Sequence, residues 1–471
     1  MFEGPSANFV AYAAILGWPL VAFAIYRLRP FPEAIAWTVL GALLILPSRV
    51  AIKIPMIPAL DKSSVGSLAA LLGCSLFSPS VRRRAPYAPG IVAALILAYV
   101  FSPVITSGLN NDPVIAGPVV IPGVGYYDGV SALLSQLIFF LPFLIGKRFL
   151  ANGEHAQMLL RVLVAASLIY SLPMFFEIRM SPQLSQWIYG TFSSSYDVEA
   201  RYGGFRPVVF MSNGLALAFF LSTSIIAAVS LWRIRARISG FNTPSVIAYL
   251  GVLLLLCKSA GALIYSLLIG PIVLWITPKA QMRIAVVLAA IAITYPILRM
   301  SDLVPTSQIL ELASSINQDR AKSLGVRFEQ EKRLLDHATE RTWFGWGRYG
   351  RNRVYDDYGK DISITDGQWI LTLGQFGLVG FIAQFGLLTF PIFRAATALK
   401  HLRSEREKVL LAATALILAV TAVEQLPNAS INSWTWLLGG ALYGFSSTAL
   451  SLKAARPIDR RRSDSAAVMN R

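Results

Sequence analysis

Three arginines, Arg201, Arg206 and Arg327, have the residue type and the position expected of a phosphate-binding site. Arg206 is followed at once by Pro207, where an apolar run begins, so its guanidinium is expected at the boundary of a bilayer. A planar guanidinium forms bidentate, charge-assisted hydrogen bonds to phosphate oxygens, which suits a phosphate attached to a lipid. The alternative for each arginine is a helix-end role, in which the stem lies along apolar surface and the head stays in water.

Asp366 is the candidate catalytic proton acceptor. It precedes the apolar run 368–393, and a carboxylate desolvated on one side can have its pKa raised towards a range useful for accepting a proton. An Asp before Gly at a helix start is also a common N-cap, and the two roles are compatible. His337 is a second candidate at the substrate site. The alternative for His337 is a solvated position in a charged helix. Lys258, in a short turn between two apolar runs, either joins the arginines or anchors a helix end.

Aromatic side chains alternate with arginines in the segment that follows residue 340. Aromatic faces beside Arg and Asp are what sugar rings stack against, but aromatic residues also form the belt at a membrane interface. The sequence leaves both interpretations open. The residues concerned are Arg341, Trp343, Phe344, Trp346, Arg348, Tyr349, Arg351, Arg353, Tyr355 and Tyr358.

Several common kinds of site are not supported by the sequence. The three histidines are far apart and no HExxH or clustered Cys/His spacing occurs, so no metal site is expected. The stretch 345–350 matches GxGxxG, but no strand precedes it and no Walker A pattern occurs, so we expect no nucleotide and no other cofactor. The apolar runs carry ionisable groups only near their ends, which disfavours ion-coupled transport.

These residues belong to a very apolar chain. Of 471 residues, 55% are hydrophobic and 14% are charged, against about 25% charged in a typical soluble domain. Cys74 and Cys257 each stand alone in an apolar run, so no disulfide framework is expected. The composition predicts an all-α polytopic membrane protein with about 12 or 13 transmembrane helices. The apolar runs lie at 8–26, 34–52, 64–78, 87–105, 130–146, 156–176, 207–231, 244–257, 260–277, 283–299, 368–393, 409–426 and 433–452.

The distribution of Lys and Arg predicts the orientation of these helices. Basic residues in short loops are retained in the cytoplasm, and they fall in alternate connections if the N-terminus is periplasmic and the C-terminus cytoplasmic. The start of the chain lacks the basic region of a cleaved signal peptide, so the first run is expected to be a retained span. The net charge of +17 therefore reflects topology and not nucleic-acid binding.

The candidate residues fall in two predicted periplasmic connections. The first is residues 177–206 and the second is residues 300–366. A connection as long as the second is usually functional or separately folded. Within it, residues 323–341 are expected to form an amphipathic helix on or near the membrane surface. The predicted parts are transmembrane helices with short loops at 1–299, interrupted by the first connection at 177–206; the long, partly helical loop at 300–366; the C-terminal transmembrane helices at 367–452; and a basic cytoplasmic tail at 453–471.

Four stretches, in order along the chain, resemble segments of the O-antigen ligase and Wzy-type polysaccharide polymerase superfamily. The resemblance covers about residues 200–390. It implies a GT-C-like helical fold and a glycosyltransferase that moves glycans from undecaprenyl diphosphate on the outer face of the bacterial inner membrane, without a metal or a nucleotide sugar. The stretches are RYGGFRPVVFMSN at 201–213, CKSAG at 257–261, GVR at 325–327 followed by FGWG at 344–347, and TDGQWILTLGQFGLVG at 365–380.

The resemblance also assigns residues. Arg201 matches the arginine before the Gly-Phe pair, Arg327 the arginine that opens the outer-loop helix, and Asp366 the position where ligases commonly have the histidine of a His-Asn pair. The departure at Asp366 favours a polymerase for exopolysaccharide or O-antigen synthesis. The alternatives are a ligase that transfers the glycan to lipid A core or another acceptor, and a lipid-linked glycan transporter. Expected partners are the undecaprenyl-diphosphate-linked glycan, membrane lipids, a chain-length regulator and export proteins.

Overall fold

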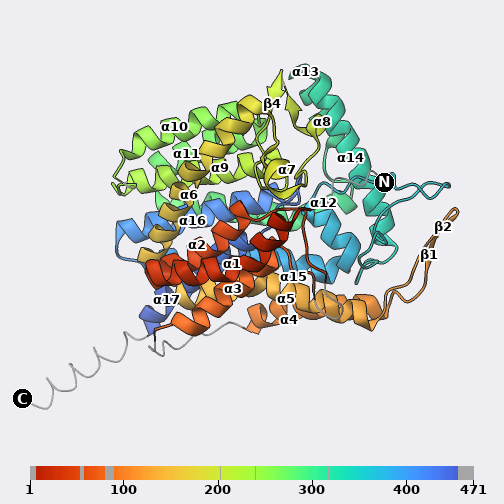
Figure 1. Cartoon of the computed structure of the whole chain (residues 1–471), viewed down its shortest axis with the longest axis horizontal. Coiled ribbons are helices and arrows are strands. Elements are labelled where there is room, and N and C mark those ends of the chain that lie inside the picture. The colour runs from red at the N-terminus through yellow and green to blue at the C-terminus, as the bar shows by residue number, and fades with distance from the viewer. Residues whose placement is uncertain are drawn as a thin grey trace, which may run out of the picture.

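The computed structural model describes residues 7–53, 58–79, 90–201, 203–238, 240–316 and 318–454. Within these residues the protein is a helical bundle with almost no sheet, as predicted, and each predicted apolar run overlaps one helix (Figure 1). The predicted cytoplasmic tail lies outside the described residues from position 455 onward. The bundle helices are α1 (Phe9–Leu28), α2 (Phe31–Ile45), α3 (Lys62–Phe77), α4 (Gly90–Gly108), α5 (Tyr126–Phe149), α6 (Gly153–Met180), α9 (Gly214–Arg233), α10 (Thr243–Leu256), α11 (Ala260–Trp275), α12 (Pro278–Met300), α15 (Gln368–Leu399), α16 (Glu405–Glu424) and α17 (Ser433–Ala454).

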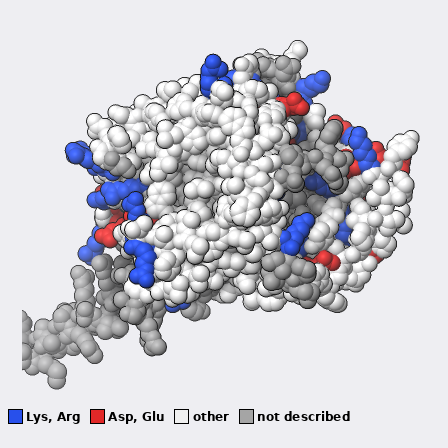
Figure 2. Space-filling model, viewed as in Figure 1, with Lys and Arg blue, Asp and Glu red and all other residues white. Residues whose placement is uncertain are grey.

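The bundle has a buried centre and an apolar outer surface. Of the described helices, seven (α1, α4, α5, α6, α9, α12 and α15) are long and apolar enough to cross a membrane, and α2, α3, α10 and α11 are shorter apolar helices. Helices α9 and α16 are buried along most of their length. Peripheral helices instead expose large apolar side chains, such as Leu20 at 76% and Leu267 at 63%. Figure 2 shows a broad band without charged side chains between two ends where they gather. This surface fits lipid, and the chain is a multi-pass membrane protein.

Two helices differ from the predicted runs for local reasons. The second run was expected to continue to residue 52, but α2 ends at Ile45, because Pro47 disfavours helical geometry at the residue before it. The run expected from 207 begins as a helix only at Gly214. Asn213 caps it by accepting a hydrogen bond from the backbone N–H of Ala216.

The remaining elements lie at one end of the bundle, where α13 and α14 and the β1–β2 hairpin are seen in Figure 1. Strands β1 and β2 pair with Ile115 opposite Val120, and β3 and β4 pair with Ala200 opposite Phe205. The predicted helix at 323–341 is present as α14. These elements are β1 (Val114–Ala116), β2 (Val119–Ile121), α7 (Leu184–Tyr189), α8 (Tyr196–Glu199), β3 (Ala200–Arg201), β4 (Gly204–Phe205), α13 (Thr306–Ile316) and α14 (Gln318–Thr339).

Helix α15 is broken at Gly377, whose φ of 64° and ψ of −165° are open only to glycine. In an unbroken helix the carbonyl of Gly374 would accept from the N–H of Leu378. Here that carbonyl accepts from the N–H of Trp346 at 2.8 Å, while Leu378 donates to the carbonyl of Thr342 at 2.8 Å. The break therefore joins the outer half of α15 to the segment 342–347, so two of the resembling stretches form one structural unit.

We expect Gly377→Ala to destabilise the protein strongly. A Cβ at this position would lie 2.3 Å from the backbone carbon of Trp343, and the strained backbone adds about 1–3 kcal/mol. Thermal unfolding of the purified protein in detergent measures the effect. Gly251→Ala in α10 is the matched control, since its Cβ would meet no atom within 4 Å. Equal unfolding temperatures for the two variants would contradict this account of the break.

Candidate functional site

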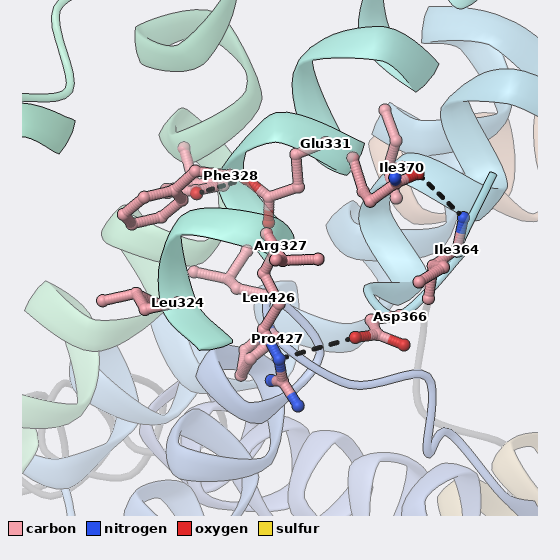
Figure 3. Close-up of a pocket in the computed structure, with 12 residues that line it drawn as sticks. Leu324, Arg327, Phe328, Glu331, Ile364, Asp366, Ile370, Leu426 and Pro427 are labelled. Atoms are coloured by element: carbon pink, nitrogen blue, oxygen red, sulfur yellow. Dashed lines mark hydrogen bonds and ion pairs between the residues drawn. The ribbon is translucent and has the colours of Figure 1, made fainter. Parts of the chain in front are cut away.

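A cavity of about 440 Å³ opens at the end of the bundle that carries α14, between α12, α14, the start of α15 and the connection from α16 to α17. Its walls are largely apolar, from side chains such as Phe328 and Leu426, and its polar groups include Arg327, Glu331 and Asp366. Figure 3 shows these side chains around the opening. A mostly apolar pocket with a few converging polar groups is the usual form of a ligand site.

Arg327 and Asp366 form an ion pair in this cavity. The Nε of Arg327 lies 3.5 Å from the Oδ2 of Asp366, and the two side chains point towards each other in Figure 3. Both are partly exposed, at 38% and 43%, so a ligand can reach them. Asp366 does not cap α15: the N-cap is Gly367, and no side chain bonds to the helix start there. The N-cap interpretation of Asp366 is therefore wrong for this structure.

Glu331 holds α14 against α12, and the sequence did not single it out. Its Oε2 accepts a hydrogen bond from the hydroxyl of Tyr295 at 3.0 Å and lies 3.4 Å from the Nε of Arg299. Arg299 also donates to the carbonyl of Phe328 at 3.1 Å. Burial raises the pKa of Glu331, although the contacts with Tyr295 and Arg299 oppose the rise. Because Glu331 follows Arg327 by four positions, the two share a face of α14, and that spacing was the available signal.

In the first outer connection, Arg206 is buried in an ion pair with Glu199. The Nε of Arg206 lies 3.1 Å from the Oε2 of Glu199, and its side chain is 6% exposed. A second guanidinium nitrogen donates to the carbonyl of Val198 at 3.0 Å. Glu199 in turn accepts from the hydroxyl of Ser194 and from the N–H of Gly214. Arg206 thus fixes the fold of the connection and offers less of its surface to a ligand than Arg327 does.

A second buried carboxylate shapes the same connection. Glu177, at the end of α6, is fully buried and accepts from the backbone N–H groups of Leu184, Val208 and Val209 at 3.1, 2.7 and 2.7 Å. Val209 has a φ of 53°, which is rare for a β-branched residue and is maintained only when the surroundings hold it. Glu177 thereby sets the path of the chain just after Arg206.

Arg206 lies within electrostatic range of cations from both connections. The pKa of Arg206 is lowered, first by burial and further by the charges of Arg201 and Arg327, while Glu199 opposes this shift. Lys258 donates a hydrogen bond from its Nζ to the carbonyl of Arg201 at 2.9 Å, so it ties the strand that carries Arg201 to the turn between α10 and α11. Of these four cations, Arg327 lines the cavity together with Asp366, while Arg201, Arg206 and Lys258 do not line it.

His337 is not part of this group. It lies ten positions beyond Arg327 on α14, a rise of about 15 Å. Its ring stacks on Trp346 with centroids 4.4 Å apart, and its Nε2 lies 3.0 Å from the carbonyl of Arg351. The guanidinium of Arg341 covers Trp346 at 4.2 Å from the ring centre. These aromatic and basic side chains pack on one another, whereas Trp343, Tyr349 and Tyr358 are at least 60% exposed and remain candidates for sugar contacts.

Two of the predicted arginines clamp the long loop to the connection after α4. Arg341 pairs with Asp112 at 2.6 Å and donates to Asn110. Arg351 is fully buried and donates to the carbonyl of Pro122 at 3.1 Å. Arg341 holds the pKa of the Asp112 carboxyl below its usual value, mainly through their hydrogen bond. The described residues contain no cluster of three His, Cys, Asp or Glu side chains that could hold a metal ion.

We expect Glu331→Gln to destabilise the docking of α14, because it leaves the buried charge of Arg299 without its counter-ion, at a cost on the order of 3 kcal/mol. Thermal unfolding in detergent is the measurement. Glu329→Gln is the matched control on the same helix, since Glu329 is 60% exposed in its pair with Arg333 and should contribute less than about 1 kcal/mol. The account fails if both variants unfold at the temperature of the unchanged protein.

The Asp112–Arg341 contact should depend on pH. Because the pKa of Asp112 is depressed in the folded protein, the contact contributes at pH values above the ordinary value of about 3.9 and is lost as the pH falls through the depressed pKa. Asp112→Asn should remove it at neutral pH. Faster hydrogen exchange in residues 341–351 would report the loss, with Asp357→Asn, an exposed acid in the same loop, as control. Unchanged exchange in Asp112→Asn would overturn this prediction.

Comparison with known proteins bears on this site. Residues 245–385 match the model of a family described as O-antigen ligase, and no curated protein matches the chain. The matched region contains Lys258, Arg327, Glu331 and Asp366, together with the break at Gly377. Residues 245–385 are therefore similar to the O-antigen ligase family, and this match confirms the predicted resemblance to the O-antigen ligase and Wzy-type superfamily.

Proposed function

We propose that the protein is a polysaccharide polymerase of the bacterial inner membrane. It joins undecaprenyl-diphosphate-linked oligosaccharide repeats on the periplasmic face, for exopolysaccharide or O-antigen synthesis. The family match supports an enzyme of the ligase and polymerase type. The observation that carries the proposal is the Arg327–Asp366 pair, a cation and a carboxylate side by side in an accessible cavity at one end of an apolar bundle.

In the proposed reaction, a sugar hydroxyl of one lipid-linked repeat attacks the anomeric carbon of another glycan. The new C–O bond forms as the bond from that carbon to the diphosphate breaks, and the electron pair leaves with the lipid diphosphate. Asp366 accepts the hydroxyl proton. Arg327 and Arg201, which is exposed, bind the diphosphate and stabilise the charge that develops on it. Displacement from the opposite side inverts the configuration at the carbon.

The buried and anchoring cations have supporting roles in this proposal. Arg206 keeps the first connection folded through its buried ion pair with Glu199. Lys258 positions Arg201 by its bond to the carbonyl of that residue. Glu331 keeps Arg327 facing the cavity, because both side chains lie on the same face of α14. His337 belongs to the packing around Trp346 and is assigned no part in the reaction.

A ligase is the second candidate, because the matching family model is described as O-antigen ligase. The two activities use the same donor and differ in the acceptor, which is a second lipid-linked repeat for a polymerase and lipid A core or another molecule for a ligase. The residue at the position of the ligase histidine is Asp366, and its carboxylate is paired with Arg327. This difference is the reason to favour the polymerase.

The test replaces the gene by variants and examines the lipid-linked glycans of the cells. Arg327→Ala and Asp366→Asn should each lower the rate of transfer by about 10²–10³-fold, through loss of charge stabilisation and of the proton acceptor. Arg333→Ala is the control, since Arg333 lies on the same helix in an exposed pair with Glu329. Membrane insertion of each variant is checked by immunoblotting of isolated membranes.

The glycans that accumulate distinguish the two activities. Loss of a polymerase leaves single repeats on the lipid carrier and no ladder of longer products. Loss of a ligase leaves the ladder on the carrier and abolishes its transfer to the final acceptor. If both site variants gave the products of the unchanged protein while inserted in the membrane, the site assignment would be wrong.

A further inference from the structure

A second cavity, of about 530 Å³, lies between α12 and α15, at the ends of these two helices opposite the first cavity. Lys279 and Arg283 come from the first turns of α12, and Lys400 follows the last residue of α15. The floor between them is apolar and includes Met282 and Leu399, both buried. Among the described residues, none of those that line this cavity carries a carboxylate. It therefore combines a positive rim with an apolar interior, the complement of an anionic amphiphile.

The three cations have no ionic partner among the described residues. Lys279, Arg283 and Lys400 are exposed, and no ion pair or hydrogen bond joins their side chains to another residue within the described ranges. Their charges converge from two segments far apart in the sequence. The start of α12 adds the positive end of its helix dipole. Three uncompensated charges around one hollow create a strong local potential for an anion.

Two other basic residues, near the start of α16, do have partners within the protein. Lys408 pairs with Glu405, and Arg406 donates two hydrogen bonds to the side chain of Gln157. Lys408 and Arg406 therefore contribute to the packing of the fold through these contacts. Membrane retention alone needs positive charge on this face but does not require it to surround a cavity.

The position along α12 places the cavity at a membrane interface. From Lys279 to Arg299 the helix rises through twenty positions, which is about 30 Å and equals the thickness of the hydrocarbon core. Trp275, at the end of α11 next to this point in the chain, is 76% exposed, as interfacial tryptophans are. The distribution of basic residues makes this the cytoplasmic interface.

An apolar surface continues from the cavity towards the middle of the bilayer. Val287, which lines the cavity, is 57% exposed, and Ile291, one turn further along α12, is 44% exposed. Residues four apart lie on one face of a helix. An acyl chain lying over Val287 and Ile291 would keep its headgroup at the level of Lys279 and Arg283.

We propose that this cavity binds an anionic phospholipid of the cytoplasmic leaflet. Its phosphate contacts Lys279, Arg283 and Lys400, and one acyl chain lies along Val287 and Ile291. Basic pockets between membrane-spanning helices on the cytoplasmic side are suited to such headgroups. A soluble phosphate compound would use the same cations but would gain nothing from the apolar floor and the exposed face of α12.

Native mass spectrometry of the full-length protein in detergent, titrated with phosphatidylglycerol, tests the proposal. The triple variant Lys279→Gln, Arg283→Gln, Lys400→Gln should bind the lipid on the order of 100-fold more weakly. The control is a second triple variant, Arg235→Gln, Arg237→Gln, Arg403→Gln, which removes the same charge from exposed residues outside the cavity. It should bind phosphatidylglycerol as tightly as the unchanged protein does. If the triple variant fails to fold, Lys400→Gln alone should still weaken binding about fivefold.

Two further ligands identify the class of molecule bound. Phosphatidylcholine should bind weakly to all variants alike, because its headgroup has no net charge. Glycerol phosphate, which carries the anionic group without acyl chains, should not displace phosphatidylglycerol. Displacement by glycerol phosphate would overturn the lipid assignment in favour of a soluble phosphate. Equal weakening in the two triple variants would show general surface charge and overturn the site itself.

Discussion

The contact of Glu331 with Tyr295 and Arg299 is the interaction on which the candidate site depends. It is the point at which a helix of the long loop is fixed to a helix of the bundle, with Arg299 buried and Glu331 largely buried. A buried charge is tolerated only with a partner, so Glu331 and Arg299 must meet for either to be stable there. Once they meet, Arg327 is carried to the edge of the cavity, where it reaches Asp366.

Carboxylates with partners inside the protein also stabilise the first connection, residues 177–206. Glu199 neutralises Arg206, and Glu177 binds three backbone N–H groups that would otherwise be buried without acceptors. Glu177 lies in the last turns of α6, and Glu199, at the end of the short helix α8, accepts from the N–H of Gly214 at the start of α9, near the expected edge of the bilayer. Irregular backbone at that depth is stable only where its polar groups are satisfied internally. These two acids therefore hold in place the connection that presents Arg201.

Much of the fold follows from hydrophobic length and periodicity. The apolar runs locate the bundle helices, and the amphipathic pattern of residues 323–341 correctly predicts a helix there, α14. Helix ends were less predictable where a single residue decides them, as Pro47 does after α2. The break in α15 was not predicted, because it depends on hydrogen bonds to a segment some thirty residues earlier. The glycines of the GxGxxG match now have a structural explanation, since Gly345, Gly347 and Gly350 all have positive φ values.

The site was predicted less completely, for reasons that lie in tertiary contacts. That Arg201 and Arg327 would both lie within electrostatic range of Arg206 could be expected only from the family resemblance, because no periodicity relates positions so far apart. Glu331 was overlooked, since an acid in a charged helix is ordinarily solvated and only its burial against Tyr295 reveals its role. Asp366 fits the pattern of an N-cap, but its carboxylate turns to Arg327 instead. His337 is held by Trp346, which no local pattern indicates.

The size of the outer cavity has a consequence for how product length is set. A space of about 440 Å³ encloses a diphosphate with the nearest sugar and no more of a long glycan. In a transferase of the proposed kind, short and long chains would present the same reacting end to the same walls. The cavity would then not distinguish chains by their number of repeats. Any preferred chain length must be set by contacts with the growing glycan outside the cavity.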